Sequence, residues 1–356
     1  MPRVLHLSEL ELPSGPALEG LIPPPRFGLT TFEGYQPQDP SQERARDEVR
    51  EFALLRPRRE AAGFRWPWRR PPEAPGQGLY LDGGFGVGKT HLLAAAYHEA
   101  EGPKAYLSFQ ELVYLIGVLG GVRAKEALGH YSLLCIDEFE LDDPGNTLIV
   151  KQFLAHALAG GGRVLTTSNT PPERQGQGRF NAHDFRREIQ SIARHFRTLT
   201  LEGGDYRQRQ HQAGLMSEAA LETLLASEPA PGPHTGPHTG PYRGPKVYGD
   251  WPALTTLLAA LHPVRYRGLL KGVGTLYLSS LTPLEDQNSA LRFVHFIDKL
   301  YDLKLGFRAS GRIALEDIFH PSYRSGAFSK KYYRCVSRLA ELLGEAQPAP
   351  VSSASA

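Results

Sequence analysis

Short apolar runs alternate with helical stretches between about residues 75 and 210 of this chain. The runs are β-prone and nearly continuous in apolar residues, as strands buried on both faces of a sheet are. They are LYL (79–81), KAYLSF (104–109), LLCID (133–137), RVLTTSN (163–169) and RTLTLEG (197–203). This alternation predicts a doubly wound parallel sheet with helices on both faces, which is an α/β fold.

A second strand, helix and strand follow nearer the C-terminus. GTLYLSSL (274–281) and KLGFRAS (304–310) flank the helical stretch SALRFVHFIDKLYDL, and a basic amphipathic helix is expected after them. A segment rich in Pro and Gly, with the tetrapeptide Gly-Pro-His-Thr in tandem, precedes this region and reads as a linker. We expect an N-terminal extension with a helix and a basic arm (1–74), an α/β core (75–226), the linker (227–249), a C-terminal α/β region (250–345) and a disordered tail (346–356).

Composition and charge exclude only a few classes of protein. The 356 residues carry a formal net charge of +2, so nothing global predicts a nucleic-acid coat or an acidic substrate. The two cysteines, Cys135 and Cys335, are far apart and sit among apolar residues, which disfavours a disulfide framework and fits a cytoplasmic location. The most apolar run, Leu112–Val122, is about half as long as a bilayer span, so we expect no transmembrane segment.

Candidate chemistry begins at the turn after the first core strand. The turn consists of Gly83, Gly84, Phe85, Gly86, Val87, Gly88, Lys89 and Thr90. Glycines let successive backbone N–H groups surround an anion, and the following helix adds the positive end of its dipole. Lys89 would reach the β- and γ-phosphates of ATP, and the Thr90 hydroxyl would ligate Mg²⁺. His91 directly follows and is included among the candidate nucleotide-binding residues.

Polar residues end the next two strands of the core. Asp137 and Glu138 follow four apolar residues, which places two carboxylates at the carboxyl end of a buried strand, where α/β sheets bind ligands. Asp137 would hold Mg²⁺ through water, and Glu138 would orient and deprotonate the attacking water. Asn169, about thirty residues later, is placed to hydrogen-bond the γ-phosphate or that water.

Two arginine-rich segments leave alternatives open. Arg179 precedes a basic helix and could stabilise the departing phosphate across a subunit interface, although each arginine of this segment also fits a solvated helix face or a salt bridge. The arm from Arg56 to Arg70 contains two tryptophans and could contact nucleic acid or an acidic surface. An exposed connector is the simpler interpretation of that arm.

The motifs taken in order resemble the ZapE family of AAA+ ATPases, which includes mitochondrial AFG-type members. The resemblance runs from about Phe32 to Leu343 and rests on YLDGGFGVGKTHL, LLCIDEFELDDP, TSNTPP, GRFNAHDFRREIQ and ALRFVHFIDKLYD. It implies hydrolysis of ATP with Mg²⁺, a division-ring protein partner in bacteria, and a cytosolic or peripheral membrane location. The Gly-Pro-His-Thr linker departs from the family pattern.

The resemblance also implies roles for individual residues. The turn from Gly83 to Thr90 matches the Walker A motif, and Asp137 with Glu138 matches Walker B. Asn169 matches sensor 1, and Arg179 lies where an arginine finger is expected. Gln42 would approach the adenine, and Arg292 is the candidate for sensor 2.

Two rival functions share the glycine turn. A helicase loader or replication initiator would use the Arg56 to Arg70 arm or the terminal basic helix on DNA, but the sequence contains no recognisable helix-turn-helix or zinc module. A small-molecule P-loop kinase would not need the C-terminal α/β region. We therefore expect an ATPase that assembles into a homo-oligomer with ATP and acts on a protein, and we do not expect a nucleic-acid partner.

Overall fold

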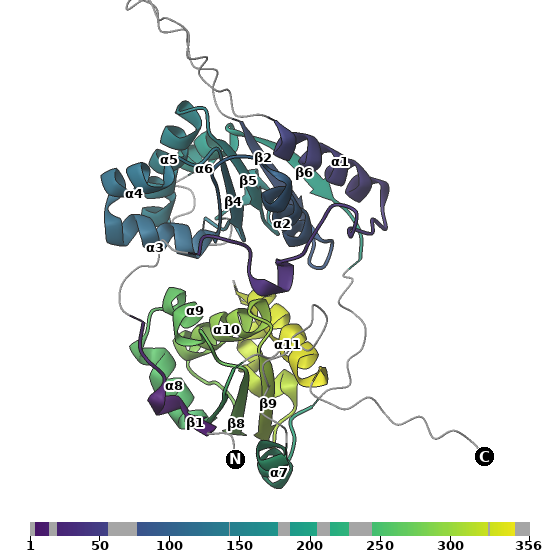
Figure 1. Cartoon of the computed structure of the whole chain (residues 1–356), viewed down its shortest axis with the longest axis vertical. Coiled ribbons are helices and arrows are strands. Elements are labelled where there is room, and N and C mark those ends of the chain that lie inside the picture. Colours follow the sequence, from purple (N-terminus) through teal and green to yellow (C-terminus); the bar gives the residue numbers. More distant parts are fainter. Residues whose placement is uncertain are drawn as a thin grey trace, which may run out of the picture. The chain divides into compact units, whose positions relative to one another are not determined.

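The computed structural model describes residues 4–13, 20–55, 77–141, 143–176, 186–204, 214–227, 244–326 and 328–345. The chain divides into two compact units, shown in Figure 1. Residues 16–208 form the P-loop unit, and residues 1–15 together with 209–356 form the C-terminal unit. The P-loop unit is therefore inserted into the chain of the C-terminal unit, and each unit is described by itself below.

The P-loop unit is built on a five-stranded parallel sheet. Its strands are β2 (Gly78–Gly83), β3 (Lys104–Ser108), β4 (Leu133–Asp137), β5 (Arg163–Thr167) and β6 (Phe196–Leu201). Their order across the sheet is β3-β4-β5-β2-β6, and every neighbouring pair is parallel. The α/β fold and the parallel sheet predicted from the apolar runs are thus confirmed. The carboxyl ends of all five strands lie at one edge, which is where the candidate residues were predicted to meet.

Helices cover both faces of this sheet. They are α1 (Pro40–Leu54), α2 (Lys89–Glu99), α3 (Phe109–Leu119), α4 (Gly121–Leu128), α5 (Pro144–Ala159) and α6 (Arg186–Ala193). One apolar cluster joins α1 and α2 to one face, and a second joins α3, α4, α5 and α6 to the other. Local caps fix the helix starts: Asp39 accepts a hydrogen bond from the N–H of Ser41, and Ser108 forms a capping box with Glu111.

The C-terminal unit contains a four-stranded parallel sheet of its own. Its strands are β1 (Val4–His6), β7 (Lys246–Asp250), β8 (Thr275–Leu281) and β9 (Gly306–Gly311), in the order β1-β7-β8-β9. Its helices are α7 (Glu218–Ser227), α8 (Trp251–Ala260), α9 (Tyr266–Leu269), α10 (Gln287–Asp302) and α11 (Ser329–Gly344). Short 3₁₀ helices in the two units are η1 (Leu7–Glu9), η2 (Pro25–Phe27), η3 (Pro172–Arg174), η4 (Pro263–Arg265), η5 (Leu315–Ile318) and η6 (Pro321–Arg324).

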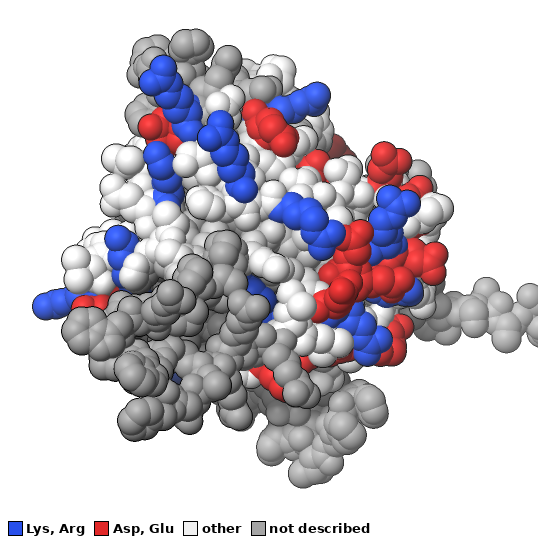
Figure 2. Space-filling view, turned by 90° about the horizontal axis from the view of Figure 1, so that it is seen from above, with Lys and Arg blue, Asp and Glu red and all other residues white. Residues whose placement is uncertain are grey.

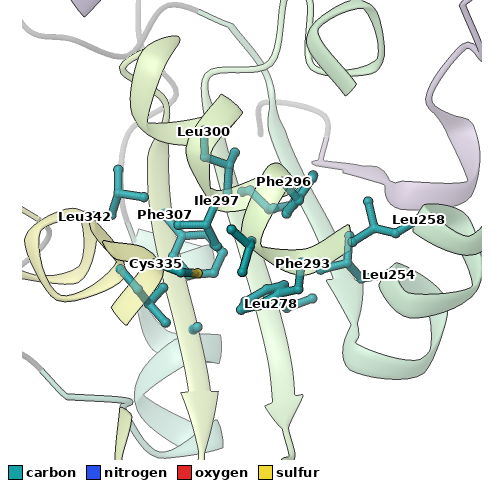
Figure 3. Packing of buried hydrophobic residues seen from close by; sticks show 14 of the residues in the cluster. Leu254, Leu258, Leu278, Phe293, Phe296, Ile297, Leu300, Phe307, Cys335 and Leu342 are labelled. Carbon is teal, nitrogen blue, oxygen red and sulfur yellow. The ribbon is translucent and has the colours of Figure 1, made fainter. Parts of the chain in front are cut away.

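An apolar core joins α8, α10 and α11 to one face of this sheet. Figure 3 shows Leu254 of α8, Leu278 of β8 and Phe307 of β9 meeting the inward side chains of α10 and α11. Cys335 lies within this core, and Cys135 is buried in β4 of the other unit. Both are free cysteines, as the sequence predicted.

A buried ionic network ties α10 to α11. The carboxylate of Asp298 accepts hydrogen bonds from Arg334, at 2.6 Å, and from Arg338, at 2.5 Å. These side chains are 9%, 4% and 8% exposed, so all three charged groups lie inside the unit. Burial raises the pKa of Asp298, but the two guanidinium groups outweigh it and hold that pKa well below its usual range.

The structure corrects the domain boundaries predicted from the sequence. β1 pairs with β7 and Leu7 enters the core of the C-terminal unit, whereas α1 packs against α2, so residues 1–74 are not one extension. α7 was assigned to the core of 75–226 but packs against β8 and β9. β7 lies in the stretch assigned to the linker. β1 was missed because a strand of three residues shows no measurable period. β7 was missed because the sequence before Lys246, where it begins, is rich in Gly and Pro.

The tandem repeat, the Arg56 to Arg70 arm and the predicted C-terminal tail lie outside the described residues. No helix among the described residues combines the length and the apolar character that a membrane crossing requires.

Candidate nucleotide-binding site

The glycine turn joins β2 to α2, as its sequence predicted. Gly88 precedes the first residue of α2 with φ of +88°, a conformation that L side chains rarely adopt. A Cβ atom there would lie 2.3 Å from Cε2 of Tyr35. Glycine is therefore required at this position by its backbone conformation and by the close approach of an aromatic ring. The backbone of the glycine turn therefore leads directly into the first residue of α2.

Lys89 points back into the glycine turn. Its ammonium group donates to the carbonyl oxygens of Gly83, at 2.8 Å, and Gly84, at 2.6 Å, and to Oδ1 of Asn169, at 2.8 Å. Lys89 is only 8% exposed. The structure thus brings together two candidate residues that are eighty positions apart in the sequence. The end of β5 and the first turn of α2 meet at one buried ammonium group.

Asp137 ends β4 with its carboxylate among three hydroxyl groups. Thr90 donates to it from α2 at 3.2 Å, Tyr106 donates from β3 at 2.9 Å, and Thr167 donates from β5. Burial raises the pKa of Asp137 and the neighbouring Glu138 charge adds to this, whereas the three hydroxyl groups favour the ionised form. Three separate elements therefore fix the orientation of this carboxylate.

Glu138 leaves the strand in a strained conformation. Its φ of +55° is in the left-handed region, which costs a residue with a side chain roughly 1 kcal/mol. Its backbone N–H donates to the hydroxyl oxygen of Thr167 at 3.1 Å, and the next N–H, of Phe139, donates to the Thr167 carbonyl at 2.7 Å. These bonds to β5 hold the chain in its turn. Such strain at a strand end is a common property of functional sites.

The segment around Thr31 and Tyr35 packs against the glycine turn and the start of α2. The Tyr35 hydroxyl donates to the carbonyl of Val87 at 2.7 Å, and burial raises the pKa of Tyr35 to about 12, so this hydroxyl stays protonated. His91 lies 2.8 Å from the carbonyl of Thr31, and burial lowers its pKa. The imidazole therefore contacts this N-terminal segment, and its inclusion among the nucleotide-binding residues stays a prediction.

Gln42 lies beside the glycine turn with both ends of its amide bonded. Its Oε1 accepts from the N–H of Gln38 at 2.9 Å, and its Nε2 donates to the carbonyl of Glu202 at 2.6 Å. Both ends of the buried amide are thus bonded to backbone, and they join the start of α1 to the chain after β6. Its contacts give structural support next to the glycine turn, and the contact with adenine stays a prediction.

Gln175 is a buried residue that the sequence did not bring to attention. Its Nε2 lies within hydrogen-bond distance of the Tyr80 hydroxyl, at 2.7 Å, the Ser168 hydroxyl, at 3.0 Å, and the carbonyl of Phe139, at 3.1 Å. Its Oε1 accepts from the N–H of Leu141 at 2.9 Å. Gln175 therefore binds the loop after β4 to the loop after β5. A lone glutamine between arginine and glycine carries no sequence signal for this role.

Tyr106 and Thr167 were also missed, but a weak signal existed for both. Each is a hydroxyl-bearing residue in a strand that neighbours β4. Once the strand order is known, parallel pairing brings both next to Asp137. The order itself is a long-range property that strand composition does not reveal.

The two arginine predictions concern different parts of the chain. Arg179 lies outside the described residues, so the finger assignment stays a prediction. Arg292 belongs to α10 of the C-terminal unit, where Nη1 donates to the carbonyls of Leu258, Ala259 and Leu261 at 2.6, 2.9 and 3.1 Å. It caps the end of α8 as a cation does at a helix C-terminus. These bonds lie within the C-terminal unit, and the assignment as sensor 2 stays a prediction.

The donor set fits a magnesium nucleotide. The described residues contain no group of three or more His, Cys, Asp or Glu side chains that could hold a metal by themselves. A P-loop Mg²⁺ does not need one, because it takes most ligands from phosphate and water and the protein adds a hydroxyl and a carboxylate. Thr90 and Asp137, whose oxygens are 3.2 Å apart, supply that pair. The buried Lys89 ammonium supplies positive charge beside them.

The parallel sheet in this strand order, with a glycine turn after β2 and an acidic pair after β4, defines a P-loop ATPase of the AAA+ type. The family model for AFG1-like ATPases matches residues 33–347, and the chain belongs to that family. The resemblance drawn from the sequence motifs is thereby confirmed. The match covers both units of the structure.

Similar proteins include the cell division protein ZapE of Escherichia coli K12. It is 26% identical over 300 residues, which cover 76% of this chain and 79% of that protein. The ZapE protein of Escherichia coli O157:H7 matches equally well.

Solved structures with some likeness include AMPPCP-bound DnaA from Aquifex aeolicus, with a TM-score of 0.37 and 14% identity over 56% of this chain and 61% of that one. The DnaC helicase loader has a TM-score of 0.35 and 17% identity over 50% of this chain and 99% of that one. Scores this low carry no argument about function.

Proposed function

We propose that this protein hydrolyses ATP to ADP and phosphate in its P-loop unit and uses the cycle to act on a protein partner. The observation that carries the proposal is the meeting of Lys89, Thr90, Asp137, Glu138 and Asn169 at one edge of one sheet. These residues come from three elements, and packing alone has no need of a buried ammonium group that is bonded to the glycine turn and to Asn169.

Each residue has a defined task in this proposal. The N–H groups of the glycine turn and the N-terminus of α2 would hold the phosphates, and Lys89 would neutralise charge on the β- and γ-phosphates. Thr90 and Asp137 would hold Mg²⁺, which would neutralise negative charge on the phosphates. Asn169 would hydrogen-bond the γ-phosphate or the attacking water. It is already fixed by its bond to Lys89.

Glu138 would act as the general base. It would accept a proton from water as the water oxygen forms a bond to the γ-phosphorus and the bond from that phosphorus to the bridging oxygen breaks. ADP takes the electron pair of the broken bond, and the proton is later released with phosphate. A carboxylate placed just past a strand end by a left-handed residue can face the ligand side of the sheet, which supports this assignment.

A protein partner and an oligomeric ATP state complete the proposal. The similar Escherichia coli protein is named for cell division, and we propose a related role here. In this role the protein would bind a component of the division ring, and it could do so at the membrane surface. Arg179 would reach a neighbouring subunit's phosphate in a homo-oligomer.

The charged surface over α1 supports a protein partner over DNA. Figure 2 shows positive and negative side chains intermixed on the side of the P-loop unit where α1 lies. Arg46 pairs with Glu43 and Asp47, and Arg50 pairs with Glu33 and Glu99. A phosphate backbone is bound by an excess of Lys and Arg over Asp and Glu. The face over α1 carries no such excess of positive charge, because its arginines are paired with acidic residues. Action on DNA, as in helicase loaders, remains the alternative to be tested.

Two variants test the chemistry directly. Lys89→Ala should abolish binding of fluorescent ATP, whereas Glu138→Gln should bind it normally and hydrolyse it at least about 100-fold more slowly, as expected for loss of water activation. Glu140→Gln, two positions further on, is the matched control and should retain normal turnover. Unchanged affinity in Lys89→Ala would refute the phosphate site, and normal turnover in Glu138→Gln would refute the general base.

The class of partner is tested with the native protein. ATP turnover per subunit that rises with protein concentration and does not change on addition of DNA would support an oligomer that acts on proteins. Strong stimulation by DNA would favour the alternative and make the Arg56 to Arg70 arm the next target.

A further inference from the structure

Thr167, the last residue of β5, touches both acidic residues of the site. A threonine hydroxyl has one hydrogen to donate and lone pairs to accept. Here it donates to Oδ1 of Asp137 and accepts from the N–H of Glu138 at 3.1 Å. Thr167 is 2% exposed, so water does not compete freely for these bonds. One buried side chain on a neighbouring strand thus links the carboxylate of one acid to the backbone of the next.

The link matters because Glu138 is in the left-handed region, with φ of +55°. An extended residue would continue the line of β4, and its side chain would leave the strand end in another direction. Besides the Thr167 bond, the N–H of Glu138 makes a contact of 3.2 Å with Oδ1 of Asp137. Loss of the Thr167 hydroxyl would therefore leave the Glu138 N–H with that one long contact, while the Phe139 N–H would keep its bond to the Thr167 carbonyl.

We propose that Thr167 is a positioning residue, which holds Asp137 and Glu138 in one fixed arrangement so that the glutamate faces the attacking water. The inference rests on the proposed function, in which Glu138 is the general base. The same strand end extends to Asn169, which bonds Lys89. The end of β5 thereby joins the phosphate-binding lysine to the two acids, and Thr167 is its contact with them.

The chain provides matched variants for a test. Thr167→Val has nearly the same shape without the hydroxyl, and Thr167→Ser keeps the hydroxyl without the methyl group. Thr166→Val is the control, because Thr166 is fully buried on the same strand and its hydroxyl makes no hydrogen bond within the described part of the chain. For each variant we would measure the steady-state kcat, the equilibrium Kd for fluorescent ATP with Mg²⁺, and the thermal unfolding midpoint.

Thr167→Val should lower kcat at least about tenfold, because a misdirected base and a lost bond to a charged group each have effects of this order. Its Kd should stay within about twofold of the native value, and Thr167→Ser should recover most of the rate. Thr166→Val should behave as the native protein. If Thr167→Val does not fold, Thr167→Ala compared with Thr167→Ser isolates the hydroxyl in a smaller side chain.

Two results would overturn the inference. One is a normal kcat in Thr167→Val, and the other is an equal loss of rate in Thr167→Ser, which would assign the effect to packing. Glu138→Gln in the same series separates the positioning role of Thr167 from the proposed role of Glu138 as the base. If Glu138→Gln is slow and Thr167→Val is not, only the positioning role is wrong, whereas normal turnover in Glu138→Gln shows that the proposed base is wrong and the inference fails with it.

Discussion

Replacing Asp298 by asparagine should destabilise the C-terminal unit strongly. The change keeps the size of the side chain but removes the negative charge that lies 2.6 Å from Arg334 and 2.5 Å from Arg338. All three groups are at least nine-tenths buried, so solvent screening cannot replace the lost attraction. Two guanidinium groups would remain inside the unit without the carboxylate that faces them.

The expected cost follows from this burial. Removing one partner of a buried ion pair costs about 3–5 kcal/mol, because the remaining charge is left uncompensated in a medium of low polarity. For a unit of this size each kcal/mol lowers the unfolding midpoint by about 2–4 °C, so a decrease of about 6–20 °C is expected. The protein without Asp298 would then have lost a large part of the usual stability of a domain.

Tryptophan fluorescence can report this unit by itself. The chain has three tryptophans, and replacing Trp66 and Trp68 by phenylalanine leaves Trp251, which is buried against Phe293 in the C-terminal core. Urea unfolding followed through Trp251 would give the free energy of unfolding for Asp298→Asn and for Asp302→Asn. Asp302 is one turn further along α10 and less buried, so it is the control. A loss below about 1 kcal/mol for Asp298→Asn would refute the reasoning.

The dependence on pH provides a second check on the same residue. The folded pKa of Asp298 is held below its unfolded value, so its contribution is fully present above the unfolded pKa of about 3.9 and is lost as pH falls through the folded pKa. The stability difference between the native protein and Asp298→Asn should therefore be constant from neutral pH to about pH 5 and shrink in stronger acid. A difference that grows in acid would contradict the assigned direction.

Two further predictions concern the P-loop unit. Gly88→Ala should weaken binding of fluorescent ATP and lower the stability of the unit by at least about 1–2 kcal/mol, because φ at Gly88 is +88° and the new Cβ would lie 2.3 Å from Tyr35. Gly117→Ala is the control, because Gly117 lies on α3 with open space around its Cβ position. Equal behaviour of the two variants would contradict the geometry. Arg179→Ala should lower ATP turnover without changing ATP affinity, and mixing it with Lys89→Ala should restore part of the turnover; no recovery on mixing would argue against an arginine supplied by a neighbouring subunit.

The sequence predicted the features that depend on local pattern. The five core strands, the glycine turn and the polar strand ends are each contained in a short stretch, so periodicity and residue type were enough to find them. Lys89 and Asn169 were expected at one site because parallel strands end at one edge of a sheet. Their direct hydrogen bond is the structural result of that expectation.

The features that were missed depend on long-range packing. β1 is too short to show a period, and it was found only through its pairing with β7. Gln175 becomes important because two loops meet around it, and the sequence did not indicate that Arg292 would bond the carbonyls at the end of α8. Neither the burial of a side chain nor its partner can be derived from its immediate neighbours in the chain.

The insertion of the P-loop unit between β1 and β7 has a consequence for synthesis. Val4 leaves the ribosome near the beginning of translation, but its partner in the sheet, Lys246, follows only after the entire P-loop unit. Domains generally fold as units during synthesis, so the P-loop unit can fold while β1 still has no sheet to join. β1 must then pair with β7 after the inserted P-loop unit has already folded. Closing the C-terminal sheet should thus be a late event in the life of each new chain.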